Sequence, residues 1–170
     1  MEIKNIPLQD LLKESWLSVP IYSSSVTSGS LREIRFLLTF KSLGDMSLKK
    51  SRENRQKFFQ KVGIDEERVL GLNQIHSRRI LAPEEMREYE FQGDGIISNR
   101  DEYFLSVTAA DCMPIALYDP VTDARAILHS GWKGTGILEE AVFILGNRFG
   151  SKVQDIVTLV GPHIGSCCYK

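Results

Sequence analysis

Hydrophobic positions recur at helical spacing in three stretches of the chain, which predict amphipathic helices. These stretches are residues 6–17, 48–62 and 135–149. Pro20 follows the first stretch and is expected to stop it. Gly63 and Gly150 follow the other two, where glycine commonly ends a helix in a left-handed conformation. Thr135 is the expected N-cap of the last helix.

Shorter apolar runs rich in β-branched and aromatic residues predict strands. They lie at residues 35–40, 69–75, 103–109, 114–118, 124–129 and 156–160. Polar segments separate them: a serine-rich loop at 23–30, an acidic turn or helix at 82–89, the turn Gly93-Asp94-Gly95 and a hairpin-like turn at 119–123. Strands and helices do not alternate strictly. The pattern therefore favours an α/β (α+β) fold, a mixed or antiparallel sheet layered with helices, over a doubly wound one.

Composition narrows the class of protein. The 170 residues are 42% hydrophobic and 25% charged, which predicts one globular domain over residues 1–170. A net charge of -1 and a pI near 6.3 give no support for nucleic acid or an anionic membrane as a partner. No apolar run reaches the roughly 18 residues that span a bilayer, and no secretory signal is recognisable. The three cysteines, two of them adjacent, form a poor disulfide framework, so we expect a reducing, cytoplasmic location.

Three residues suggest a metal site: His76, Cys112 and His129. Each is placed by the pattern at or beside the end of a strand, where scaffolds often hold reactive groups. One thiolate and two imidazoles suit zinc or copper, and three protein ligands leave a fourth position open. Zinc at such a site lowers the pKa of a water from about 15.7 to about 7. The alternative is a buried structural cysteine with hydrogen-bonded histidines, since the spacing matches no local metal motif.

The turn from Gly131 to Thr135 is a candidate anion site. Gly131 and Gly134 permit sharp bends, Lys133 adds a positive charge, and a helix N-terminus follows. The turn is not a Walker A loop, so ATP hydrolysis gains no support. The alternative is an ordinary strand-to-helix turn with Lys133 in solvent. Trp132 either packs under the loop or stacks on a planar ligand.

Two acidic residues are candidates for orienting the metal ligands. Asp94 and Asp111 could accept hydrogen bonds from a ligand histidine, although Asp94 also suits a plain turn. The same cluster admits a cysteine hydrolase. Cys112 would then be the nucleophile, His129 or His76 its base, and the glycine turn an oxyanion hole.

Five motifs in order carry a family resemblance. They are Asn73-Gln74-Ile75-His76, Gly93-Asp94-Gly95-Ile96-Ile97, Thr108-Ala109-Ala110-Asp111-Cys112-Met113-Pro114, His129-Ser130-Gly131-Trp132-Lys133-Gly134-Thr135 and Gly161-Pro162-His163-Ile164-Gly165-Ser166-Cys167-Cys168-Tyr169. Over residues 36–169 the chain resembles the YfiH-like family, also called the polyphenol oxidoreductase laccase or laccase-domain family.

The resemblance implies a fold and a site. The fold is a layered α/β/β/α arrangement with a mixed sheet, shared with cysteine-histidine toxin deamidases. The implied metal ligands are His76, Cys112 and His129, with zinc as the metal and copper as an alternative.

The resemblance also implies an activity. The family phosphorolyses adenosine, inosine, guanosine or methylthioadenosine to base and sugar 1-phosphate, and it deaminates adenosine to inosine. The implied partners are a purine nucleoside and phosphate, and a homodimer is an open option. Other family descriptions give copper-dependent laccase activity on phenols, or peptidoglycan editing.

The chain departs from the family pattern in three places. It has Lys133 where arginine is usual, and a lysine keeps the charge but loses the bidentate fork. The usual arginine-glycine-glycine-serine segment is not recognisable. Members usually continue beyond the Cys-Cys-Tyr motif, so we expect the C-terminal part to be missing. A non-catalytic metal-binding module is therefore a further alternative.

Overall fold

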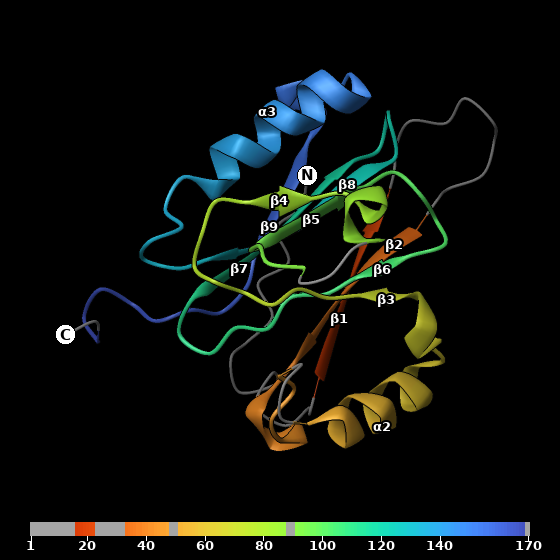
Figure 1. Cartoon of the computed structure of the whole chain (residues 1–170), viewed down its shortest axis with the longest axis vertical. Helices are drawn as coiled ribbons and strands as arrows, with labels where there is room; N and C mark the ends of the chain where they lie inside the picture. The colour runs from red at the N-terminus through yellow and green to blue at the C-terminus, as the bar shows by residue number, and fades with distance from the viewer. Residues whose placement is uncertain (1–15, 23–32, 48–50, 88–90, 169–170) are drawn as a thin grey trace.

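A computed structural model describes residues 16–22, 33–47, 51–87 and 91–168 of the chain (Figure 1). The predicted serine-rich loop at 23–30 and most of the predicted first helix, residues 6–15, lie outside these ranges.

A five-stranded sheet forms the centre of the described structure. Its strand order is β4-β5-β8-β7-β9. The strands are β4 (Ile80–Leu81), β5 (Gly95–Ser98), β8 (Ala124–Ser130), β7 (Met113–Asp119) and β9 (Val157–Val160). β4 and β5 run parallel, and every other neighbouring pair is antiparallel. The prediction of a mixed sheet accompanied by helices is therefore confirmed.

Two smaller strand pairs and two α-helices complete the described part of the chain. β1 (Trp16–Tyr22) pairs antiparallel with β2 (Glu33–Thr39), and β3 (Val69–Leu70) pairs parallel with β6 (Phe104–Leu105). The helices are α2 (Arg52–Val62) and α3 (Ile137–Phe149). Short 3-10 turns are η1 (Lys41–Leu43), η2 (Glu66–Arg68), η3 (Pro83–Arg87) and η4 (Val153–Asp155). In Figure 1, α3 and α2 lie at opposite ends of the molecule, with the sheet and the small strand pairs between them.

The sheet is buried on both faces, and successive residues of a strand contribute to different hydrophobic clusters. Ile97 and Leu128 pack with Ala141 and Leu145 of α3. Their strand neighbours belong to the opposite cluster, with partly buried residues of β2, β3 and β6: Ile96, Ile127, Phe36, Leu70 and Leu105. This is the period of two that a strand imposes on its side chains. Each fully buried Ile or Leu contributes roughly 1.5–3 kcal/mol.

The helix C-termini follow the prediction. Gly63 ends α2 with φ 71° and Gly150 ends α3 with φ 76°, both in the left-handed region that glycine adopts without strain. The N-terminus of α3 differs. Gly136 is the N-cap, and the hydroxyl of Thr135 instead donates to the carbonyl of Trp132. The prediction of Thr135 as the cap is wrong, because its hydroxyl closes the preceding turn.

Three sequence predictions of secondary structure need correction. Residues 16 and 17 belong to β1, and Pro20 lies within that strand opposite Arg35. Proline is tolerated there because β1 has only one neighbouring strand in the described structure. The predicted strands at 69–75 and 103–109 shrink to β3 and β6, two residues each. The described part of the predicted helix at 48–62 begins at Arg52, because Ser51 has non-helical dihedrals, φ -144° and ψ 75°.

Neither described helix is long and apolar enough to cross a membrane; α3, the longer, has 13 residues.

Candidate metal centre

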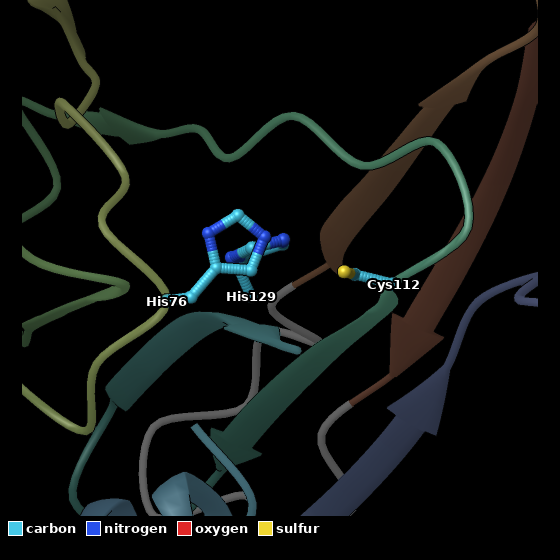
Figure 2. Close-up of side chains that lie close together, drawn as sticks. All are labelled: His76, Cys112 and His129. Atoms are coloured by element: carbon cyan, nitrogen blue, oxygen red, sulfur yellow. The ribbon is translucent and has the colours of Figure 1, made fainter. Parts of the chain in front are cut away.

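The three residues predicted as metal ligands lie together. One ligand atom from each of His76, Cys112 and His129 lies within 4.8 Å of the others. Figure 2 shows the Cys112 sulfur directed toward the two imidazoles from across the site. His129 is buried, Cys112 is half-buried and His76 is exposed. The cluster is therefore closed on the sheet side and open to solvent at His76.

The register of the sheet accounts for this meeting. His129 lies on β8 and pairs with Pro114 of β7, so Cys112 lies just beyond the end of that ladder. On the other side of β8, Gly95 pairs with Leu128, and the N–H of His129 donates to the carbonyl of Asp94 at 2.7 Å. The neighbouring strands β5, β8 and β7 thus bring residues that are distant in sequence to the same end of the sheet.

Asp94 holds the segment that carries His76. The carboxylate is fully buried, with 0% exposure. It accepts from the backbone N–H of Ile75 (3.3 Å), His76 (3.0 Å) and Ser77 (2.6 Å), and from the Ser77 hydroxyl (2.8 Å). His76 has φ 59°, a left-handed conformation that is uncommon for a residue with a side chain. The contacts with Asp94 stabilise this conformation, which the predicted strand leading into His76 did not anticipate.

Asp94 also orients the second imidazole. The Nδ1 atom of His129 lies 2.8 Å from Oδ1 of Asp94. Burial alone would raise the pKa of Asp94, but hydrogen bonds from Ser77, His129 and His76 outweigh it, and the pKa is lowered. An ionised carboxylate only accepts, so Nδ1 of His129 carries a proton and Nε2 is the ring nitrogen that could bind a metal. The ring centroids of His76 and His129 lie 4.9 Å apart, and the planes of the two rings form an angle of 78°.

The environment of Cys112 favours the protonated thiol. Burial, and then the charges of Asp111 and Asp94, raise the pKa of Cys112. Asp111 is exposed, and within the described ranges its carboxylate makes no hydrogen bond to either histidine. A cation between the thiol and the imidazoles would offset this cost, because metal ligation deprotonates a thiol.

The glycines of the turn make room for the site. A Cβ on Gly131 would lie 2.7 Å from the His76 ring and 3.2 Å from the Cys112 sulfur. A Cβ on Gly134 would lie 2.6 Å from the carbonyl oxygen of Ser77. The N–H of Gly134 donates to the carbonyl of Gly131, so that group is occupied within the turn. These glycines therefore allow the turn to pack closely against residues 76–77.

The other predicted residues of the turn are exposed. Lys133 and Thr135 face solvent, and Trp132 is 77% exposed, so Trp132 does not pack under the loop. Sequence reasoning missed two residues beside the site: Ser77, which donates to Asp94, and Arg78, whose guanidinium lies against Gly136 at the start of α3. The available signal was their position directly after His76.

The donor set fits a borderline-soft divalent ion. Two imidazole nitrogens and one thiolate suit zinc or copper. The 4.8 Å limit between ligand atoms exceeds the roughly 3.3–3.8 Å expected around tetrahedral zinc, so the side chains would have to move closer together to hold an ion. The Asp94–His129 contact is the carboxylate–histidine pair that orients ligands in many metal sites. This group could therefore bind a metal ion.

The fold and the sequence both resemble known proteins. The crystal structure of a Bacillus licheniformis hypothetical protein, YfiH, is similar with a TM-score of 0.68 and 28% identity, covering 91% of this chain and 61% of that one. A purine nucleoside phosphorylase of Clostridium acetobutylicum is 38% identical over 101 residues, 58% of this chain and 42% of that protein. A Mus musculus purine nucleoside phosphorylase is 32% identical over 121 residues, 69% of this chain and 27% of that protein.

These relatives are longer, and the chain spans less than two thirds of each. The model of one family, described as multi-copper polyphenol oxidoreductase laccase, matches residues 39–170. That region covers most of the chain and includes all three candidate ligands. The chain therefore belongs to this laccase-domain family, whose curated relatives are named purine nucleoside phosphorylases.

Proposed function

We propose that this chain carries the metal centre of a zinc-dependent purine nucleoside phosphorylase. The observation that carries the proposal is the cluster of His76, Cys112 and His129, with ligand atoms within 4.8 Å of one another. Relatives named purine nucleoside phosphorylases support the substrate class. The proposed substrates are adenosine, inosine, guanosine or methylthioadenosine with phosphate, and the products are the base and the sugar 1-phosphate.

The proposal gives each residue a role. His76, Cys112 and His129 hold the ion, and Asp94 keeps the proton of His129 on Nδ1. Lys133, exposed on the turn before α3, attracts phosphate, with Gly131, Gly134 and Thr135 shaping that turn. In phosphorolysis a phosphate oxygen bonds to C1′ of the sugar as the bond from C1′ to the purine nitrogen breaks. Exposed Trp132 offers an apolar face for the purine.

Adenosine deamination is the second proposed reaction at the same centre. When bound, zinc supplies a water activated at neutral pH, which deamination needs. The open side of the cluster at exposed His76 is where a nucleoside would approach. Copper is the alternative ion, since the same donor set suits it, and it would support the oxidation of phenols that the family description names.

A cysteine hydrolase fits these residues less well. A protein-activated cysteine needs a lowered pKa or a base in hydrogen-bond contact. Burial, with Asp111 and Asp94, instead raises the pKa of Cys112. Within the described ranges no hydrogen bond joins Cys112 to either imidazole, and the Nδ1 atom of His129 is bonded to Asp94.

Product analysis tests the proposal. Purified protein of known metal content is incubated with adenosine, with and without phosphate and with and without a chelator, and the products are separated. We expect adenine and ribose 1-phosphate only with phosphate, inosine without it, and neither after chelation. Cys112→Ser should abolish both, whereas Cys167→Ser, a change at an exposed cysteine, should abolish neither.

Other results would assign other functions. Bound zinc with no product from any of the four nucleosides would leave a metal-binding module without turnover. Amide hydrolysis that survives the chelator but not thiol alkylation would point to the cysteine hydrolase. Oxygen consumption with a phenol, dependent on added copper, would point to the oxidase.

A further inference from the structure

The side chain of Gln74 makes three hydrogen bonds to Thr108. Its Oε1 accepts from the Thr108 N–H at 2.8 Å and from the Thr108 hydroxyl at 2.9 Å. Its Nε2 donates to the Thr108 carbonyl at 2.7 Å. Only this orientation of the amide serves both an N–H donor and a carbonyl acceptor, so the partners define it. All three polar groups of Thr108 are therefore satisfied by one glutamine.

The Gln74–Thr108 hydrogen bonds lie beyond the point where the backbone pairing of β3 and β6 ends. β3 and β6 pair only over two residues each, and the last backbone bond beyond them runs from the N–H of Ser106 to the carbonyl of Leu70. Within the described ranges, no backbone–backbone hydrogen bond joins residues 71–79 to residues 107–112. Gln74 carries the connection across this gap.

The two segments joined by this contact lead to different candidate ligands. Gln74 lies two residues before His76, and Thr108 lies four residues before Cys112. Asp94 does not make this connection, because its carboxylate bonds to residues 75–77 and to His129, and its backbone N–H donates to the carbonyl of Arg79. The intervening residues from 109 to 111 are exposed. The Asp111 carbonyl also accepts the N–H of Ile164 at 2.9 Å. The position of the thiol therefore depends on β7, on this bond and on the Gln74–Thr108 contact, and of these the Gln74–Thr108 contact alone leads to the segment that carries His76.

We propose that Gln74 is a positioning residue of the metal centre, and that its contact with Thr108 sets the separation between the Cys112 sulfur and the His76 imidazole. The proposal rests on the proposed metal centre. Mutation of a residue that orients a metal ligand without binding the metal itself typically lowers metal affinity about 10- to 100-fold.

Metal titration of Gln74 variants tests this role. Zinc affinity is measured by competition with a chromophoric chelator, and the thiolate-to-cobalt absorption is measured with Co²⁺. For Gln74→Ala we expect zinc affinity to fall about 10- to 100-fold and the thiolate-to-cobalt band to weaken. Gln74→Glu keeps both acceptor contacts but cannot donate to the Thr108 carbonyl, so we expect a loss of about fivefold.

Gln56→Ala is the matched control. Gln56 donates to Glu66 from α2, away from the cluster, so zinc affinity and the cobalt spectrum should be unchanged. A Gln74→Ala protein with zinc affinity within about twofold of the parent and an unchanged cobalt band would overturn the proposal. If Gln74→Ala does not fold, unchanged affinity in Gln74→Glu overturns it equally. Failure of the parent chain to bind zinc would instead refute the metal centre itself.

Discussion

Asp94 and His129 are joined twice: the Asp94 carboxylate faces Nδ1 of His129 at 2.8 Å, and the Asp94 carbonyl accepts the His129 N–H at 2.7 Å. The first contact defines the imidazole tautomer, and the second continues the register between β5 and β8. The same carboxylate holds the backbone of His76. One buried acid thus places two of the three candidate ligands.

Replacing this acid should affect both stability and metal binding. In Asp94→Asn a buried NH₂ group would face the backbone N–H groups that now donate to the carboxylate. We therefore expect the free energy of unfolding to fall by about 3 kcal/mol. Zinc affinity should also fall. Urea unfolding of the metal-free protein and zinc titration measure the two effects. Asp65→Asn is the control: Asp65 caps η2 in solvent, where asparagine caps as well, and a change below about 0.5 kcal/mol is expected. Equal stability of the two variants would contradict the role of Asp94.

Removing the thiol should remove most of the metal affinity. Cys112→Ser leaves two imidazoles and a hydroxyl, a poor ligand for zinc, so we expect affinity to fall more than about 100-fold. Elemental analysis after dialysis against zinc, with Cys167→Ser as the control, measures this. Stoichiometric zinc in Cys112→Ser would show that the thiol is not a ligand.

The turn glycine nearest the cluster should resist a side chain. In Gly131→Ala the new methyl group would lie 2.7 Å from the His76 ring and 3.2 Å from the Cys112 sulfur, so one of them has to move. We expect about a tenfold loss of zinc affinity with the fold retained. Gly146→Ala is the control, because its methyl group would meet only the Ser151 carbonyl at 3.6 Å. As a change within α3, it should stabilise the protein by about 0.5–1 kcal/mol. Undiminished zinc affinity in Gly131→Ala would mean that the site tolerates displacement.

Lys133 should affect phosphate and spare the metal. The side chain is exposed and lies outside the ligand cluster. In a chain that turns over nucleoside, Lys133→Ala should raise the KM for phosphate with the zinc content unchanged. Lys133→Arg should lower that KM, because a guanidinium binds phosphate through two hydrogen bonds. Phosphate kinetics at saturating inosine would measure both, and an unchanged KM in both variants would assign phosphate binding elsewhere.

A second buried acid, Asp119, should make the stability of the protein depend on pH. Asp119 is fully buried and accepts from the Val121 N–H, the Thr122 N–H and the Thr122 hydroxyl. Burial alone would raise its pKa, but hydrogen bonds from Ser151, Thr122 and Val121 outweigh it and lower the pKa below the ordinary 3.8. The unfolded chain therefore takes up the proton first as pH falls. The stability contributed is present above about pH 4 and is lost as pH falls through the lower folded pKa.

Asp119→Asn isolates this effect. The variant should be about 1–3 kcal/mol less stable than the parent at pH 7, and the difference should narrow below about pH 4. Urea unfolding at a series of pH values measures it. A difference that is independent of pH would show that the charge of Asp119 contributes nothing.

The sequence predicted those parts of the fold that depend on local chemistry. Gly63 and Gly150 end helices because only glycine adopts their left-handed conformation without strain. The strands at 114–118 and 124–129 were recognisable because each is a short apolar run bounded by turn residues, the pattern of a strand buried on both faces. The predictions failed where a residue's environment overrides its propensity, as for Trp16 in β1 and for Thr135 before α3.

By itself, the sequence determined which residues have the chemistry of a metal site, since thiol and imidazole groups are few and recognisable. Only the tertiary structure decided that His76, Cys112 and His129 meet, because strand order and register depend on long-range pairing. The left-handed backbone of His76 and the several contacts of Asp94 also arise there, since they require groups that lie far apart along the chain. Residue type thus sets which ligands are available, and packing sets their geometry.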